Sequence, residues 1–404
     1  MTPQQSLARI RRYDGRLRAF VRTFDPPLYG EAEDGPTFAV KDLMDVAGVP
    51  TGGGGRTPLV PSPHVHAVVV ERLLQAGWTA VGKTHTVELA FGSWGSNPVL
   101  GAPWNPWDAG IHRAPGGSSS GSAVAVAAGL CDAALGSDTG GSVRIPASFN
   151  GVYGIRPTHG RIGTAGARDM APSFDTIGWF ASTPGVFRDV GPVILDHRRV
   201  PANISRVIVL EDAFEQADPE VADLLRTLLE FMADDLPAVA HGRIAPDGFD
   251  DWREAMRIGQ AYEVWQTFGD FVKKHNPKIG PGISDRIAFA ATVTKQAAEQ
   301  AAAVRAKIRE HVFQTSVPGT VFALPTAPCI APRVDSSETE MQSFRVRVMG
   351  LTCIASLTGL PQISIPAGTI SGCPIGLSFI GWAGGDEALL DLAVKLARHC
   401  GMVA

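Results

Sequence analysis

The sequence predicts an α/β fold, because strand-like runs alternate with helical runs along most of its 404 residues. The first alternation is a strand over 37–40, a helix over 66–77 with apolar residues at helical spacing, and a strand over 79–81. A second helical run over 122–128 precedes a strand over 131–135. This alternation is typical of α/β proteins, in which helices pack on a central sheet.

The elements before and between these runs follow from spacing and from glycine. Apolar residues at helical spacing (Leu7, Ile10, Leu17 and Phe20) predict an N-terminal helix on the outside of the body. The glycine run at 52–55 cannot form regular structure. Gly140 and Gly141 predict a tight turn, with a helix starting near Ser142 or Val143.

The second half of the chain has a different texture between Pro219 and about Gln314. Its pattern is more charged and helical with few strand signals, which predicts a helical layer or cap; the helical runs cover 221–236, 252–275 and 283–311. The α/β pattern surrounds this segment, with strands over 207–210 and 321–324, a helix over 344–357, a hairpin of 362–365 with 375–380, and a helix over 386–399.

Composition excludes several classes of protein. The 36 Lys and Arg residues nearly balance 40 Asp and Glu residues, for a net charge of −4, and we find no basic stripe. Nucleic acid is therefore not an expected partner. The five cysteines are widely spaced without a Cys-x-x-Cys pair, so neither disulfides nor a zinc site is expected. His64 and His66 have metal-like spacing but no evident third ligand, so we expect neither metal nor cofactor.

The N-terminus has no apolar core that could serve as a signal peptide. No run reaches the roughly 18 apolar residues that a membrane span needs. We therefore expect a cytoplasmic protein that does not enter a membrane.

Two serines and a lysine in glycine-rich segments are the candidate catalytic residues: Ser118, Ser142 and Lys41. A serine hydroxyl is a weak nucleophile until a neighbouring base takes its proton, and histidine is the usual base. Neither serine segment contains a histidine. A buried, neutral lysine can do the same work, because burial disfavours its charged form.

Glycine is abundant here, at 45 of 404 residues, and is concentrated around these three residues. A loop such as 139–142 can turn several backbone N–H groups toward one point, which is how an oxyanion hole is built. The phosphate-binding pattern Gly-x-x-x-x-Gly-Lys-[Ser/Thr] and the nucleophile elbow Gly-x-Ser-x-Gly are both absent at these positions. From these residues alone, acyl-transfer catalysis and an unspecified anion site stay equally open.

The segments GGSSSGSAVAVAAGL and GSDTGGSVRIPASFNGVYGIRPTHGRI resemble the signature region of the amidase signature enzymes. AVKDLMDVAGVPTGGG resembles the lysine segment of that family, and GKTHTVELAFG, APSFDTIGWFAS and LTGLPQISIPAG…GCPIGLSFIGW resemble further segments. The resemblance implies the amidase signature fold, a mixed central β-sheet sandwiched by helices. It implies one domain over 1–404, with a core of 28–200 and 316–404 and a helical subregion of about 211–315.

Carried over position by position, the resemblance implies that Ser142 is the nucleophile, Ser118 the bridging serine and Lys41 the base. It also implies a cis peptide bond between Gly117 and Ser118. The oxyanion would be received by the N–H groups of the loop residues Thr139, Gly140, Gly141 and Ser142.

Other polar residues near the signature have supporting interpretations. Asp138 and Arg144 flank the nucleophile loop, either as a scaffolding pair or with Arg144 meeting the substrate. Ser119 either forms hydrogen bonds within its loop or fills space. We interpret Glu88 and Arg113 as members of structural ion pairs, and His85, His112 and His159 as polar packing near the mouth of the site.

Within the family, the sub-pattern is most similar to plant-type indole-3-acetamide hydrolases, for example in SVRIPAS, PSFDTIGWFA and IGPGISDRI. This implies a small primary amide of the arylacetamide type as substrate. Residues near the catalytic segments could line an aromatic-accepting pocket, namely Gly117, Phe91, Trp94, Trp104 and Met44.

Three alternatives stay open: hydrolysis of urea-like amides such as biuret derivatives, a glutaminase subunit of a tRNA-dependent amidotransferase, and an inactive amidase-like docking module. The presence of Lys41, Ser118 and Ser142 argues against the last. The resemblance allows a homodimer and does not exclude an accessory subunit.

Overall fold

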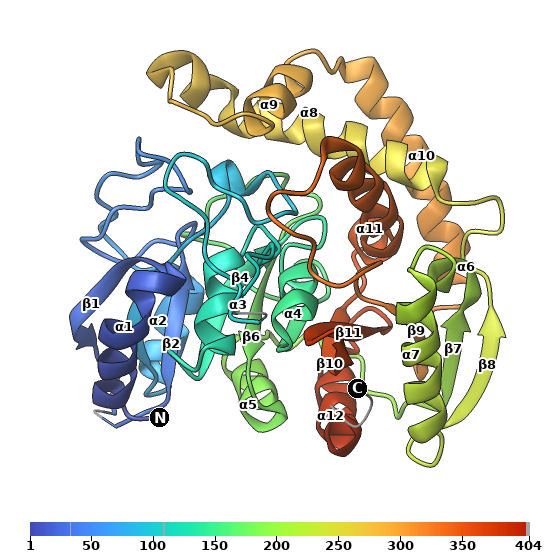
Figure 1. Cartoon of the computed structure of the whole chain (residues 1–404). Helices are drawn as coiled ribbons and strands as arrows, with labels where there is room; N and C mark the ends of the chain where they lie inside the picture. The colour runs from blue at the N-terminus through green and yellow to red at the C-terminus, as the bar shows by residue number, and fades with distance from the viewer. Residues whose placement is uncertain (33, 108–109, 401–404) are drawn as a thin grey trace.

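The computed structural model describes residues 1–32, 34–107 and 110–400 and contains one eleven-stranded sheet (Figure 1). The strand order is β1-β3-β2-β4-β6-β5-β10-β11-β9-β7-β8, with both parallel and antiparallel neighbours. The prediction of an α/β fold around a mixed sheet is therefore confirmed.

The N-terminal part of the chain forms one half of the sheet. Its strands are β1 (Phe20–Leu28), β2 (Thr37–Lys41), β3 (Thr79–Thr84), β4 (Ala133–Asp138), β5 (Tyr153–Arg156) and β6 (Thr176–Ala181). β2 runs parallel to both β3 and β4, whereas the other neighbours in this half are antiparallel.

The C-terminal part forms the other half. Its strands are β7 (Arg206–Leu210), β8 (Ala238–Gly242), β9 (Thr320–Pro325), β10 (Gln362–Ile370) and β11 (Cys373–Ile380). The halves meet where β10 pairs antiparallel with β5, from Gln362 opposite Arg156 to Ser364 opposite Gly154. β10 and β11 form the predicted hairpin, with a turn at Ser371 and Gly372 that places both residues at positive φ.

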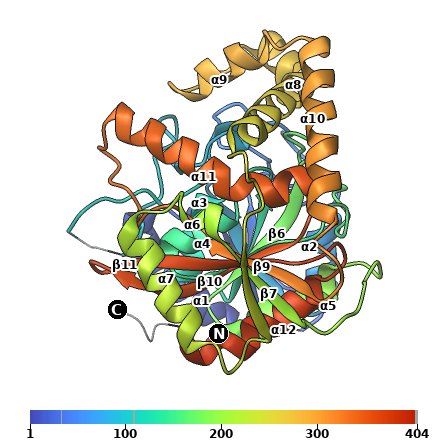
Figure 2. The same cartoon turned by 90° about the vertical axis from the view of Figure 1, so that its right-hand side faces the viewer.

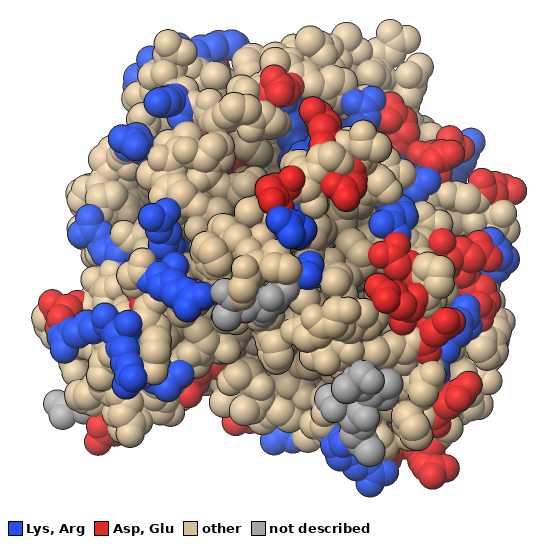
Figure 3. Space-filling view, in the orientation of Figure 1, with Lys and Arg blue, Asp and Glu red and all other residues tan. Residues whose placement is uncertain are grey.

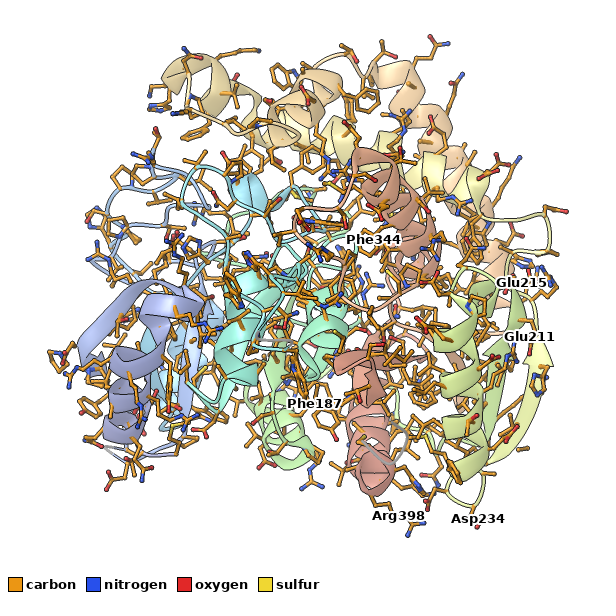
Figure 4. All side chains as sticks on the ribbon, viewed as in Figure 1. Phe187, Glu211, Glu215, Asp234, Phe344 and Arg398 are labelled. Atoms are coloured by element: carbon orange, nitrogen blue, oxygen red, sulfur yellow. The ribbon has the colours of Figure 1, made fainter. Side chains whose placement is uncertain are left out.

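Helices cover both faces of the sheet (Figure 2). One face is buried by α2 (Val68–Gln75), α5 (Pro184–Ile194), α7 (Pro219–Phe231) and α12 (Asp386–Leu396), which share the largest apolar cluster. Phe187 of α5, labelled in Figure 4, belongs to this cluster. The opposite face is covered by α1 (Pro3–Leu17), α3 (Ser120–Ala127), α4 (Arg144–Asn150) and α11 (Glu338–Thr358). Short helices are α6 (Glu211–Phe214) and the 3₁₀ turns Glu88–Ala90 and Ala397–His399.

The alternation of side chains along β2 decides which face receives Lys41. Phe38 and Val40 pack into the cluster beneath α2 and α5, whereas Ala39 packs into the cluster that contains α1 and α3. Successive side chains on a strand point to opposite faces. Lys41 therefore points to the α3 face, at the carboxyl end of its strand.

Three helices form a cap at the top of the molecule in Figure 1: α8 (Asp250–His275), α9 (Ile283–Ala290) and α10 (Lys295–Phe313). α8, α9 and α10 form the predicted helical layer, but the region 219–314 differs from the prediction in three respects. α7 packs on the sheet against β9 and β10, and β8 is the edge strand beside β7. The helical run predicted over 283–311 is also two helices, separated by a turn at 291–294.

The N-terminal helix forms as predicted, but Phe20 starts β1 and does not continue the helix. β1, β5, β6, β8 and α5 were not predicted. β1 and β8 are edge strands with largely exposed or half-buried side chains, so they lack the apolar run of a buried strand.

The surface has a basic face that sequence analysis missed. Figure 3 shows basic side chains gathered in its lower left, the part of the view where α1 lies in Figure 1. Five exposed arginines lie on and just after α1: Arg9, Arg11, Arg12, Arg16 and Arg18. The five arginines lie within ten consecutive residues, 9–18, and the helix buries Leu7 and Ile10 while it leaves the arginines exposed. The expectation of no basic stripe is therefore wrong for this face.

Candidate active site

The side chain of Lys41 lies beside two serine hydroxyls at the end of β2. Its Nζ is 2.7 Å from Ser118 Oγ and 2.8 Å from Ser137 Oγ. Lys41 and Ser118 are fully buried. The structure thus brings together a lysine and a serine that are 77 positions apart in the sequence.

Burial lowers the pKa of the Lys41 amine to about 7, against the opposing effect of the negative charges of Asp138 and Asp175. Its two acceptors among the described residues are neutral hydroxyls, so no carboxylate contacts the ammonium form directly. The neutral amine is therefore well populated near neutral pH, and a neutral amine can accept a proton.

The loop before α3 holds Ser118 next to Lys41. The Gly117–Ser118 peptide bond is cis, as the resemblance implied. The N–H of Val87 donates to Ser118 O at 3.2 Å, and the N–H of Gly117 donates to Ser93 O at 2.8 Å. A Cβ on Gly117 would lie 2.8 Å from both Gly92 O and Gly95 N, so only glycine fits there.

Ser142 lies against the same loop, because the N–H of Ser119 donates to Ser142 O at 3.2 Å. Ser142 is 8% exposed, so the residue is buried but not fully closed to solvent. Ser119 Oγ accepts the N–H of Ser137 at 3.3 Å and lies 3.2 Å from Ser137 O. Ser119 thus forms hydrogen bonds within the site, as one of the two interpretations expected.

The carboxylate of Asp138 fixes the nucleophile loop. Its oxygens accept the N–H groups of Gly141 at 2.9 Å, Val143 at 3.0 Å and Arg144 at 3.3 Å. Burial alone would raise the pKa of this carboxyl, but the charges and hydrogen bonds of Arg144 and Arg156, with the Val143 amide, hold it well below its usual range. Asp138 therefore stays ionised and shapes the turn that presents Ser142.

Every nitrogen of the Arg144 side chain donates a hydrogen bond within the protein. It donates to both oxygens of Asp138, to Thr352 O at 2.9 Å, to Gln362 Oε1 at 2.6 Å and to Ser356 Oγ at 3.0 Å. Its side chain is fully buried. These contacts join α4 to α11 and β10, and they favour the scaffolding interpretation over contact with substrate.

The predicted oxyanion loop divides into engaged and open amides. The Gly141 N–H is occupied by Asp138, whereas the amides of Thr139, Gly140 and Ser142 have no protein acceptor among residues 1–32, 34–107 and 110–400. Gly141 has φ +114 and could not take a side chain without strain. Three amides of the predicted set of four thus remain able to bind an oxygen of a ligand.

Sequence reasoning missed two residues of this site, Ser137 and Asp175. Asp175 Oδ1 accepts the Thr139 hydroxyl at 2.5 Å, and Oδ2 accepts the N–H groups of Met170 and Ala171. Both residues were within segments that resemble the family, GSDTGGS and APSFDTIGWFAS. Their spacing gave no sign that Ser137 would bond to Lys41 or that Asp175 would anchor Thr139.

The aromatic and apolar residues proposed for a substrate pocket are dispersed. Met44 is buried in the large cluster beneath α2 and α5, on the face opposite to Lys41. Phe91 packs with the cap helices. Trp94 packs edge-to-face on Phe344, which is labelled on α11 in Figure 4, at 5.3 Å between ring centroids. Trp104 stacks on His112 at 3.8 Å. The structure does not bring these residues together.

Three of the remaining polar candidates, Glu88, Arg113 and His159, have partners within the protein. Glu88 accepts the N–H of Gly280 at 3.0 Å, so its partner is a backbone amide and not the basic side chain that an ion pair would need. Arg113 donates to Ala331 O at 2.9 Å, and His159 Nε2 lies 2.9 Å from Pro172 O. Burial lowers the pKa of His85 to about 4, so its ring is neutral.

His66 Nδ1 accepts the N–H of Ala47 at 3.2 Å. No group of three His, Cys, Asp or Glu side chains is placed to bind a metal in the part of the chain that the structure describes. Within that same part, none of the helices is both long and apolar enough to cross a bilayer.

The sheet, the two glycine-rich loops and the buried lysine define an α/β protein with a serine–lysine site of the hydrolase type. A family model described as Amidase matches residues 1–202 and 266–390. The chain therefore belongs to the amidase signature family.

Curated relatives are similar over most of the chain. Amidase 1 of Arabidopsis thaliana is 34% identical over 397 residues, which cover 90% of this chain and 92% of that protein. The chloroplastic outer envelope protein 64 of Arabidopsis thaliana is 33% identical, over 91% of this chain and 67% of that protein.

Solved structures have the same fold. A crystal structure of an amidase has a TM-score of 0.89 at 28% identity and covers 99% of this chain and 97% of its own. One subunit of the glutamyl-tRNA(Gln) amidotransferase of Thermotoga maritima has a TM-score of 0.82 at 26% identity, over 99% of this chain and 91% of its own.

Proposed function

We propose that the protein hydrolyses the C–N bond of small amides to a carboxylic acid and ammonia, with Ser142 as nucleophile. The observation that supports this most directly is the 2.7 Å contact of Lys41 Nζ with Ser118 Oγ in a fully buried setting. A lysine whose pKa is about 7 is a competent base at neutral pH.

In the proposed acylation, Ser142 Oγ attacks the carbonyl carbon and loses its proton to Ser118, whose own proton passes to Lys41 Nζ. The carbonyl oxygen becomes an oxyanion and accepts hydrogen bonds from the open amides of the 139–142 loop. One such donor contributes about 3 kcal/mol to the stability of the transition state.

Collapse of the tetrahedral intermediate breaks the C–N bond. Lys41 returns its proton through Ser118 to the departing nitrogen, which leaves as ammonia. The acyl group remains as an ester on Ser142. Water then attacks this ester, and the same relay takes its proton and returns one to Ser142 Oγ, which releases the acid.

Arylacetamides, with indole-3-acetamide as the representative, are the substrate class that we propose. The support is the sequence sub-pattern together with the apolar side chains of the cap above the nucleophile loop, such as Met256. We further propose that the protein acts in the cytoplasm as one domain without a metal.

A docking role without catalysis is the second candidate, because the sequence resemblance left it open and a relative whose name describes no enzyme, an outer envelope protein, covers most of this chain. The test measures ammonia release by the purified protein and its Ser142→Ala variant on indole-3-acetamide, phenylacetamide, benzamide, glutamine, malonamide and biuret. We expect turnover of an arylacetamide that the substitution abolishes. Release from glutamine or biuret alone would reassign the substrate, and equal silence of both proteins would favour docking.

A further inference from the structure

The cap helix α8 lies directly on the nucleophile loop. A methyl group placed on Gly140 would lie 2.7 Å from Met256 Cε and 3.6 Å from the Gln260 side-chain nitrogen. Residues four apart on a helix project from the same face. Met256 and Gln260 therefore both face the loop whose amides would bind the substrate oxygen.

Hydrogen bonds fix the position of α8 over this loop. Glu263, one turn after Gln260, accepts the N–H of Ser173 at 2.9 Å and its hydroxyl at 2.5 Å. Ser173 lies two residues before Asp175, which accepts the hydroxyl of Thr139 next to Gly140. α8 and the nucleophile loop are thus tied to the same short segment.

Glycine allows the close approach of α8. A Cβ on Gly259 would lie 3.1 Å from the Phe174 ring, so a larger residue would push the helix outward. Phe174 in turn lies beneath the guanidinium of Arg305, at 4.0 Å. The separation between Gln260 and the loop is therefore set by packing.

Gln260 lies between two apolar clusters. Trp252, Ala255 and Met256 of α8 belong to one cluster. Ala261, Val264 and Phe268 of the same helix belong to another. Gln260 is half-buried between them, and its carboxamide makes no hydrogen bond with any residue that the structure describes. A carboxamide can both donate and accept, so this side chain has free capacity for a ligand.

Met256 and Gln260 also lie outside the segments that the family model matches, which end at 202 and resume at 266. Lys41, Ser118 and Ser142 all lie inside the first matched segment. The candidate catalytic residues therefore lie in the part of the chain that the family model matches, whereas Met256 and Gln260 lie outside it.

We propose that Met256 and Gln260 form the wall that recognises the acyl group of the substrate. The thioether of Met256 packs on an aromatic ring. The Gln260 carboxamide, which no hydrogen bond within the described residues holds in one orientation, turns its oxygen to accept a hydrogen bond from an N–H on that ring. Methionine makes favourable contacts with aromatic rings. The ligand class is thus an aromatic amide with a ring donor, of which indole-3-acetamide is the simplest example. This inference rests on the proposed amidase function.

The test is Gln260→Leu, which keeps the size of the side chain and removes its polar group. We expect kcat/KM for indole-3-acetamide to fall by about 3- to 10-fold, mainly through KM, since one neutral hydrogen bond contributes about 1 kcal/mol. The value for 1-methylindole-3-acetamide, which lacks the ring N–H, should not change. Gln266→Leu, on an exposed position of the same helix, is the matched control and should leave both substrates unaffected.

Binding separates this inference from the proposed function. Calorimetry of indole-3-acetamide with the Ser142→Ala variant, with and without Gln260→Leu, measures recognition without turnover. Loss of affinity that depends on Gln260 would support the wall even if the wild type hydrolysed nothing. An equal fall in kcat for both indole substrates would overturn the proposal in favour of a role at the carbonyl, and no change in any measurement would overturn it outright.

Discussion

Two buried lysines lie on neighbouring strands, and their surroundings differ. Lys41 ends β2 and Lys83 lies in β3, where it pairs in register with Val40. Lys41 points to the α3 face and contacts the hydroxyls of Ser118 and Ser137. Lys83 forms an ion pair with Asp42 at 2.9 Å and donates to Pro50 O and Thr51 Oγ1.

Burial lowers the pKa of both amines, and the two lysines differ in the carboxylates that oppose this effect. The carboxylate of Asp42 contacts Lys83 and favours its charged form. The carboxylates that act on Lys41 belong to Asp138 and Asp175 and make no direct contact with it. Contacts with hydroxyls therefore suit Lys41 to the proposed role of a base, whereas contact with a carboxylate suits Lys83 to the role of a structural cation.

The largest expected effect is on catalytic activity, which should distinguish Lys41 from Lys83. Lys41→Met should lower kcat/KM for an amide substrate by about 10²- to 10⁴-fold, the range typical of a general base. Steady-state ammonia release measures it. Lys83→Met, assayed per folded molecule, should retain far more activity. Equal losses in the two variants would break the comparison.

The second effect separates them by stability. Lys83→Met should lower the free energy of unfolding by about 3–5 kcal/mol, because Asp42 would be left buried and unpaired. Urea denaturation measures this loss, and adding Asp42→Asn should recover part of it. Lys41→Met leaves no carboxylate unpaired, so a loss as large as that of Lys83→Met would contradict our account.

The third effect is the pH dependence of Lys41. Below its pKa of about 7 the amine is protonated and cannot accept a proton, so kcat/KM should fall tenfold per pH unit there and level off above. Between pH 7 and about 10.5 the folded protein binds fewer protons at Lys41 than the unfolded chain, so this group makes stability rise with pH.

Two profiles measure this: kcat/KM from pH 5 to 9, and the free energy of unfolding of wild type against Lys41→Met from pH 6 to 10. In the Lys41→Met variant, the free energy of unfolding should rise less steeply with pH, because the contribution of Lys41 is missing. Activity that is highest at acid pH would refute the role of Lys41 as base.

The smallest effect concerns the second hydroxyl. Ser137→Ala removes one acceptor from Lys41, which should lower kcat/KM by about 2- to 10-fold. It should also move the acid limb to lower pH, because the protonated amine loses a hydrogen bond. Ser378→Ala, which removes a buried hydroxyl bonded to Thr326 in the other half of the sheet, serves as control. An unchanged profile for Ser137→Ala would show that Ser118 alone positions the amine.

The fold class and the three catalytic candidates could be predicted from sequence, because each depends on a local pattern. Strand and helix periodicity places β2, β3 and α2, and the resemblance of the lysine and signature segments to a known family marks Lys41, Ser118 and Ser142 as candidates. The edge strands β1 and β8 could not be predicted, since their half-exposed side chains lack a buried strand's apolar run.

Contacts between distant segments were also beyond prediction. Met44 follows Lys41 closely in sequence, yet it is buried on the opposite face of the sheet. Gln260 is far from every catalytic segment in sequence, yet α8 places it beside Gly140. Sequence patterns therefore predicted the lysine and the serine that the structure brings together, but not the residues that surround them.

The junction of β5 with β10 divides the sheet into an N-terminal and a C-terminal half, seen as the left and right of Figure 1. All three catalytic candidates lie in the first half, and the second half with its cap covers them. In the amidase that we propose, substitutions in the cap would therefore alter which molecules are accepted while the reactive atoms keep their positions. Exchange of the cap segment between relatives would then change the specificity and leave the proposed reaction in place.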